Sequence, residues 1–195
     1  MIDLRPFLLT AAITAGISGP ALSADTFEID PNHTNVVFMV DHLGYSNLIG
    51  DFNDIAGTFV FDQDNVADSK VELVIQAASI DTDHEARDEH LRSPDFLNVE
   101  EFPEITFVST AIEQTGDNTG KITGDLTILG EARPVTLDVT FNSVAPHPIP
   151  FYEGVIVAGF SARAQVNRID HGMTYGQGGI GDVLDLIIEV EGHKK

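Results

Sequence analysis

The side chains best suited to catalysis or metal binding are seven histidines, and their spacing does not build a metal site. His84 and His90 lie six residues apart, whereas two ligands on one helix face lie three or four residues apart. His33 and His42 stand at opposite ends of an expected strand, about 30 Å apart at about 3.3 Å per residue. The sequence has no cysteine, which excludes thiolate ligands and disulfides. We therefore expect neither a metal site nor a cofactor.

A glycine-rich segment, residues 176–181, superficially resembles a phosphate-binding loop. Such a loop must open a helix, whereas this one precedes a strand-like run at residues 183–190, so we predict an ordinary loop. No Gly-x-Ser-x-Gly elbow is present, and no pair of carboxylates stands out from the acidic background. His171, beside Asp170 and Arg168, is the one local suggestion of a polar catalytic group. We predict no catalytic residues.

Arg87, His90 and Arg92 form a small group in a chain with ten basic residues against 31 acidic ones. They could hold a phosphate or carbonyl headgroup, since guanidinium groups bind such oxygens well. The alternative is that they pair with nearby carboxylates such as Asp88 and Asp95. The three residues are candidates for the rim of a binding site.

The elements that must position these residues are strands. Apolar residues alternate with Thr136, Asp138 and Thr140, and the same period of two recurs in most segments between residues 36 and 190. This alternation is typical of an antiparallel sheet with one dry face. About eight such strands form either a sandwich or a closed barrel.

The dry faces of these strands are rich in phenylalanine, with no tryptophan and only three tyrosines in the chain. A closed eight-stranded barrel either fills its interior with side chains or keeps room for one ligand. A cavity here would be lined almost wholly by hydrocarbon and phenyl rings, and would suit an acyl or prenyl chain. The residues that we predict to line it are Phe38, Val40, Phe59, Leu73, Ile75, Phe107, Leu126, Ile128, Leu137, Val139 and Phe160.

Two segments interrupt the strands. Thr82 and Glu85 form a capping box that predicts a short helix at about residues 83–92, lying over a barrel mouth or serving as a crossover connection. Three prolines predict a loop between residues 143 and 151.

The N-terminus predicts export. Residues 1–24 read as a signal peptide, with Arg5 in a short basic region, an apolar run at residues 7–17 and small residues before a cleavage site. Residues 25–195 then form one domain, without an apolar stretch long enough to span a bilayer. Because a lipoprotein needs a cysteine for its lipid, we expect a free, soluble protein in the bacterial periplasm.

The formal net charge is −21. Such an acidic surface repels phosphate backbones and anionic headgroups. We therefore expect no nucleic-acid partner and no stable membrane insertion or tight docking on a membrane surface.

Nine short segments, by their order and spacing, resemble the YceI-like family of secreted, lipocalin-like proteins that bind polyisoprenoids. The segments are residues 27–34, 40–44, 50–52, 57–59, 79–82, 87–96, 102–107, 124–130 and 167–173. The sequence departs from the family pattern at Thr34, where serine is usual, and at His171, where an aromatic residue is common.

The resemblance implies an all-β fold, a single extended antiparallel eight-stranded lipocalin-like β-barrel with the short helix inserted between strands. It implies a binding or carrier protein rather than an enzyme, and some members pair as homodimers. The ligand would be an isoprenoid lipid or similar amphiphile: a polyprenyl chain, an isoprenoid quinone or a fatty amide. Two alternatives remain, a protein-interaction module with a solid core and acidic surface, and a lipid-modifying enzyme using the same pocket.

Overall fold

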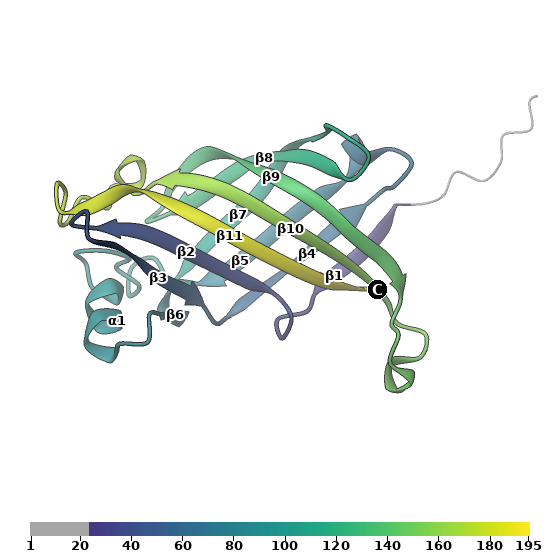
Figure 1. Cartoon of the computed structure of the whole chain (residues 1–195), viewed down its shortest axis with the longest axis horizontal. Helices are drawn as coiled ribbons and strands as arrows, with labels where there is room; N and C mark the ends of the chain where they lie inside the picture. Colours follow the sequence, from purple (N-terminus) through teal and green to yellow (C-terminus); the bar gives the residue numbers. More distant parts are fainter. Residues whose placement is uncertain (1–23) are drawn as a thin grey trace, which may run out of the picture.

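Antiparallel strands make up most of the protein in the computed structural model, which describes residues 24–195 (Figure 1). The predicted signal peptide lies outside the described residues, except for Ala24. The strands are β1 (Asp25–Ile29), β2 (Asn35–His42), β3 (Ser46–Phe52), β4 (Ile55–Phe61), β5 (Lys70–Gln76), β6 (Ile80–Asp81), β7 (Glu104–Gln114), β8 (Thr119–Ile128), β9 (Glu131–Pro146), β10 (Ile156–Asn167) and β11 (Ile180–Lys194). The helices are α1 (Glu85–Arg92) and the short 3-10 turns η1 (Val66–Asp68), η2 (Ala77–Ser79), η3 (Pro150–Tyr152) and η4 (Arg168–His171).

The eleven strand segments act as eight barrel strands, because three barrel strands each consist of two consecutive segments. β1 and β2 lie end to end along β11, since Ile29 pairs with Gly192 and Asn35 pairs with Glu189. β4 and β3 run along β1 and β2, and β5 and β6 run along β4 and β3. The sheet then continues through β7, β8, β9 and β10 to β11. The prediction of a closed eight-stranded antiparallel barrel is confirmed, and the sandwich is excluded.

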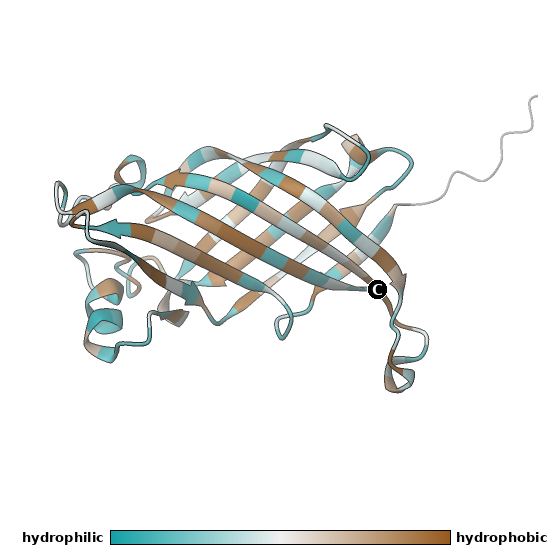
Figure 2. Ribbon diagram, in the orientation of Figure 1, coloured by the Kyte–Doolittle hydropathy of each residue, from teal (hydrophilic) through white to brown (hydrophobic). Residues whose placement is uncertain are grey.

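The period of two decides which side chains enter the barrel. On β9, Val135 is buried and Leu137 and Val139 are half-buried, whereas Thr136 and Asp138 between them are exposed. Figure 2 shows apolar and polar residues alternating along the long strands. Because successive side chains of a strand point to opposite faces, the apolar set of every strand meets inside.

Helix α1 lies at one end of the barrel, which we call the helix end; the opposite end is the far end (Figure 1). The prediction of a short helix at about residues 83–92 is confirmed, but the prediction that Thr82 caps it is wrong. The N-cap is His84, whose Nδ1 accepts from the Arg87 amide. Thr82 lies two residues before this cap, and between them Asp83 has a left-handed φ of 59° that turns the chain. The Thr82 hydroxyl instead donates to the buried Asp88 carboxylate.

The prolines near residue 146 do not end the strand where the sequence predicted. β9 continues to Pro146, which pairs with Ile156 of β10. Beyond Thr140, β9 pairs with β10 alone, because β8 starts at Thr119 opposite that residue. Proline is tolerated on such an edge, where its missing N–H faces away from the ladder. The loop therefore lies later in the chain than predicted, at residues 147–155.

Candidate functional site

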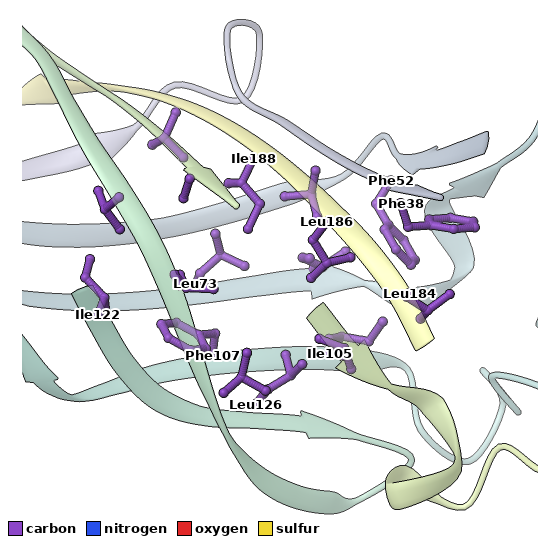
Figure 3. Close-up of a pocket in the computed structure, with 18 of the residues that line it drawn as sticks. Phe38, Phe52, Leu73, Ile105, Phe107, Ile122, Leu126, Leu184, Leu186 and Ile188 are labelled. Atoms are coloured by element: carbon purple, nitrogen blue, oxygen red, sulfur yellow. The ribbon is translucent and has the colours of Figure 1, made fainter. Parts of the chain in front are cut away.

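A cavity of about 840 Å³ extends inside the barrel, with lining residues at both ends. The ten side chains labelled in Figure 3 enter it from β2, β3, β5, β7, β8 and β11. They are Phe38, Phe52, Leu73, Ile105, Phe107, Ile122, Leu126, Leu184, Leu186 and Ile188. All ten are apolar, so the middle of the barrel offers contact area rather than hydrogen bonds.

A cavity of this size leaves its lining without the packing contacts of a solid core, which lowers the stability of the fold. Water is held poorly where polar partners are scarce. A long apolar molecule would recover the lost contacts along the whole lining.

Thirteen of the fourteen residues predicted for the site lie along this cavity. They are Phe38, Val40, Phe59, Leu73, Ile75, Phe107, Leu126, Ile128, Leu137, Val139, Phe160, Arg87 and His90. Arg92 does not line it: its Nε and Nη2 donate to the carbonyls of Ala78 and Ile80 at 2.7 and 2.8 Å. That any of them contacts a ligand stays a prediction.

Several lining residues were not in the predicted set. They are, among others, Phe52, Ile105, Ile122, Tyr175, Leu184, Leu186 and Ile188. Strand parity could have supplied most of them, because they share a face with predicted residues on the same or neighbouring strands. Tyr175 could not be found this way, because it reaches the cavity from the loop between β10 and β11.

The polar groups at the helix-end mouth are partly engaged within the protein. The Arg87 guanidinium donates to Thr82, from Nε to the hydroxyl at 2.7 Å and from Nη2 to the carbonyl at 2.6 Å. His90 Nε2 lies 3.0 Å from the Asp95 carboxylate. The predicted pairing alternative therefore holds for His90 with Asp95, while Arg87 is held by Thr82.

Three rings at this mouth are in mutual contact, and they come from α1, from the segment after it and from the β10–β11 loop. His90 of α1 makes edge contacts with Phe96 and with Tyr175, each at 5.0 Å between ring centroids. Phe96 and Tyr175 are 5.1 Å apart. Because Tyr175 lies on the β10–β11 loop, this cluster joins the loop to the helix across the end of the cavity.

The far end has a different lining. Phe59, Phe61, Phe141 and Phe160 form a continuous aromatic cluster, with centroid distances of 5.1–5.6 Å. Polar side chains surround it at this end: Gln63, Ser69, Gln114, Asp117, Asn118, Thr119 and Lys121. Lys121 is not free to bind a ligand anion, since its Nζ lies 2.6 Å from Asp138.

Arg168 is the most buried charged side chain of the site, at 2 % exposure. Its guanidinium donates to the backbone carbonyls of Met173, Tyr175, Ile180 and Gly181 at 2.5–3.1 Å. Burial lowers the pKa of this guanidinium, and Asp182, 3.7 Å away, counteracts that effect. The side chain therefore fixes the loop that carries Tyr175.

His171, the one suggested catalytic group, is 2 % exposed and is not among the residues that line the cavity. Its Nδ1 lies 2.9 Å from the Glu131 carbonyl. Among residues 24–195, no three His, Asp or Glu side chains are placed to hold a metal ion. No helix in the same range is both long enough and apolar enough to cross a membrane.

Fold and site together define an extended, closed β-barrel with a long apolar cavity and a helix at one mouth. A family model described as the YceI-like domain matches residues 27–192, and the chain belongs to this family. The protein is 42 % identical to Protein YceI of Escherichia coli O17:K52:H18 over 186 residues, 94 % of each chain. It is 40 % identical to a UPF0312 protein of Pseudomonas savastanoi over 187 residues, 95 % of this chain and 93 % of that one.

Solved structures share the barrel. Burkholderia cenocepacia BcnA superposes with a TM-score of 0.75 at 22 % identity, covering 84 % of this chain and 98 % of that chain. The Campylobacter jejuni YCEI protein has a TM-score of 0.68 at 31 % identity, covering 80 % and 90 %. A polyisoprenoid binding domain from Saccharophagus degradans has a TM-score of 0.65 at 11 % identity, covering 89 % and 100 %.

Proposed function

We propose that this protein is a periplasmic carrier that binds an isoprenoid lipid or a similar long-chain amphiphile inside its barrel. The observation that carries the proposal is the apolar cavity of about 840 Å³. Its volume lies within the roughly 300–1,000 Å³ of ordinary ligand sites. The family membership and the polyisoprenoid binding domain that shares the fold support the same ligand class.

The mechanism is reversible burial, with no bond made or broken. The tail of the ligand would lie along the apolar middle of the barrel, where burial is worth about 25 cal/mol per Å² before the costs of binding. A polar headgroup would lie at the helix-end mouth, near Arg87 and His90, whose side chains already interact with Thr82 and Asp95. The location in the periplasm rests on the N-terminal sequence.

The test is mass spectrometry of the protein purified without detergent, before and after solvent extraction. We expect a co-purifying prenyl lipid, quinone or similar amphiphile at close to one molecule per barrel. A protein that carries no lipid and takes up no added polyprenyl alcohol would contradict the proposal, and would favour the interaction module with an acidic surface.

A matched pair of variants separates the cavity from the surface. Leu126→Trp places a large ring in the cavity, whereas Val108→Trp adds the same ring at an outward position that is 46 % exposed. We expect Leu126→Trp to lower the bound lipid and Val108→Trp to leave it unchanged. Equal lipid content in both variants would place the lipid outside the barrel.

A further inference from the structure

Two uncharged segments meet at the helix end of this acidic protein. Residues 43–50, in the β2–β3 turn and β3, and residues 172–181, in the loop before β11 and at its start, contain no Asp, Glu, Lys or Arg, although the chain has a net charge of −21. The Leu43 amide donates to the Gly179 carbonyl at 2.9 Å, so the two segments form one rim (Figure 1). We call Leu43, Tyr45 and Tyr175 the uncharged rim.

The uncharged rim is exposed and also continuous with the cavity. Leu43 is 57 % exposed, Tyr45 87 % and Tyr175 47 %. Tyr175 also lines the cavity and packs on His90 at its mouth. Tyr175 therefore belongs both to the exposed rim and to the lining of the cavity.

The backbone at Leu43 makes the exposure harder to explain by folding alone. Leu43 and Gly44 have φ values of 60° and 73°, and the Tyr45 amide donates to the His42 carbonyl at 3.1 Å. A β-turn whose two central residues both have positive φ favours asparagine followed by glycine, and a branched apolar residue is disfavoured there. Leu43 is neither suited to the turn nor buried, so its apolar side chain is better explained by a contact outside the molecule.

We propose that the uncharged rim docks transiently on the headgroup region of a zwitterionic lipid bilayer, with the helix-end mouth facing the membrane. Tyrosine suits this region because it has an apolar ring and a polar tip, and two of the three tyrosines in the chain belong to the rim. Residues 43–50 and 172–181 carry no charged side chain that would have to lose its water, and the adjacent Asp41 carboxylate accepts a hydrogen bond from the Gly44 amide at 3.0 Å. The purpose of docking, exchange of a lipid with the cavity, rests on the proposed function.

A second copy of the chain fits the rim less well. A stable protein interface buries about 800 Å² on each partner, whereas the uncharged rim consists of three side chains on two turns. Two molecules that each carry a charge of −21 also repel one another. The same charge opposes binding to anionic headgroups, so the contact is with zwitterionic lipid and is transient.

The chain has no tryptophan, which allows a direct test with a single reporter. Tyr45→Trp places the reporter on the uncharged rim, and Phe151→Trp places it on the β9–β10 loop at the far end; both native side chains are 87 % exposed. Each variant is mixed with phosphatidylcholine vesicles, with and without brominated acyl chains. We expect the Tyr45→Trp emission to shift to shorter wavelength and to be quenched by the brominated lipid, with Phe151→Trp unchanged.

Three outcomes would overturn the proposal. The emission of Tyr45→Trp does not change on adding vesicles, or the emission of both variants changes equally. In the third, the emission wavelength of Tyr45→Trp shifts with protein concentration in the absence of vesicles. The last outcome would assign the rim to a second copy. Leu43→Asn in the Tyr45→Trp background should weaken the quenching, since asparagine suits the turn but removes the apolar group. Ile149→Asn is the control at the far end and should leave it unchanged.

This test is independent of the cargo. Quenching by vesicles requires no bound lipid, so a protein that docks but carries no isoprenoid would refute the proposed function alone. A protein that carries lipid but is not quenched would refute the docking alone.

Discussion

At the scale of single residues, Arg168 does more than any other polar side chain to define the site. Four backbone carbonyls, two from the β10–β11 loop and two from the start of β11, converge on one guanidinium, which is almost completely buried. Arginine can satisfy them because its planar fork presents five N–H donors. The loop in turn holds Tyr175 against His90 at the mouth.

We expect Arg168→Met to destabilise the protein by about 3 kcal/mol, because one buried and three partly buried carbonyls lose their donors, and a buried carbonyl without a donor costs about 1–3 kcal/mol. Arg168→Lys should restore only part of this, because an ammonium cannot reproduce the fork. Urea unfolding of the two variants measures the effect. Arg163→Met is the control, since Arg163 is 53 % exposed; equal losses in the Arg163 and Arg168 variants would refute the assignment.

At the scale of elements, the barrel depends on the break that divides β1 from β2. Asp30 lies at this break, and its carboxylate accepts from the amide and side chain of Asn32 and contacts His33 Nδ1 at 2.7 Å. His193 of β11 lies 3.5 Å from the same carboxylate. The turn at residues 30–34 is therefore tied to the strand that closes the barrel.

The Asp30–His33 pair predicts a pH dependence of stability. Burial alone raises the pKa of Asp30, but the hydrogen bonds from His33 and Asn32 outweigh it and lower the pKa below its ordinary 3.8. The hydrogen bond to Asp30 and its charge raise the pKa of His33 above its ordinary 6.5. A lowered carboxylate pKa stabilises the fold above pH 3.8, and this contribution is lost as the pH falls through the folded value. A raised histidine pKa stabilises it below pH 6.5, and this contribution is lost as the pH rises through the folded value.

The coupling between the two side chains should therefore be largest between about pH 4 and pH 6.5. A double-mutant cycle of Asp30→Asn and His33→Gln, measured by thermal unfolding from pH 3 to pH 9, gives this coupling. Glu191 and His193 also face the pair and stay unchanged in every arm of the cycle. A coupling that does not vary with pH would contradict the assignment.

At the scale of the whole molecule, the barrel combines an interior that its side chains only partly fill with a highly charged exterior. The cavity of about 840 Å³ gives up side-chain packing that a solid core would have. The net charge of −21 adds repulsion across the surface. Both effects lower the free energy of unfolding, so a ligand that fills the interior should raise the stability of the whole barrel.

We expect removal of the bound lipid to destabilise the protein. A ligand present at 100 times its dissociation constant stabilises the native state by about 2.7 kcal/mol. The midpoint of urea unfolding should therefore fall after solvent extraction and recover when lipid is added back. Leu126→Trp should show a smaller difference, and identical midpoints despite verified loss of the lipid would contradict this expectation.

Much of the fold could be predicted from strand alternation, because a period of two marks both the strand and its dry face. Phe107 and Leu126 were placed in the cavity on that basis, and both line it. The alternation could not distinguish a barrel from a sandwich, since both bury one face of each strand. Closure was decided by the pairing of β11 with both β1 and β2, which joins residues near opposite ends of the chain, such as Phe27 and Lys194.

The sequence by itself determined which side chains are apolar, where most of the strands lie, and that one short helix interrupts them. Local geometry and composition are sufficient for these features, because they depend on neighbours in the chain. Only the tertiary structure decided that the dry faces enclose a cavity rather than a solid core. It also decided that Arg92 is turned to backbone carbonyls and that Tyr175 reaches the mouth from a loop. These features depend on the curvature and register of the closed sheet, which bring together residues that no local pattern relates.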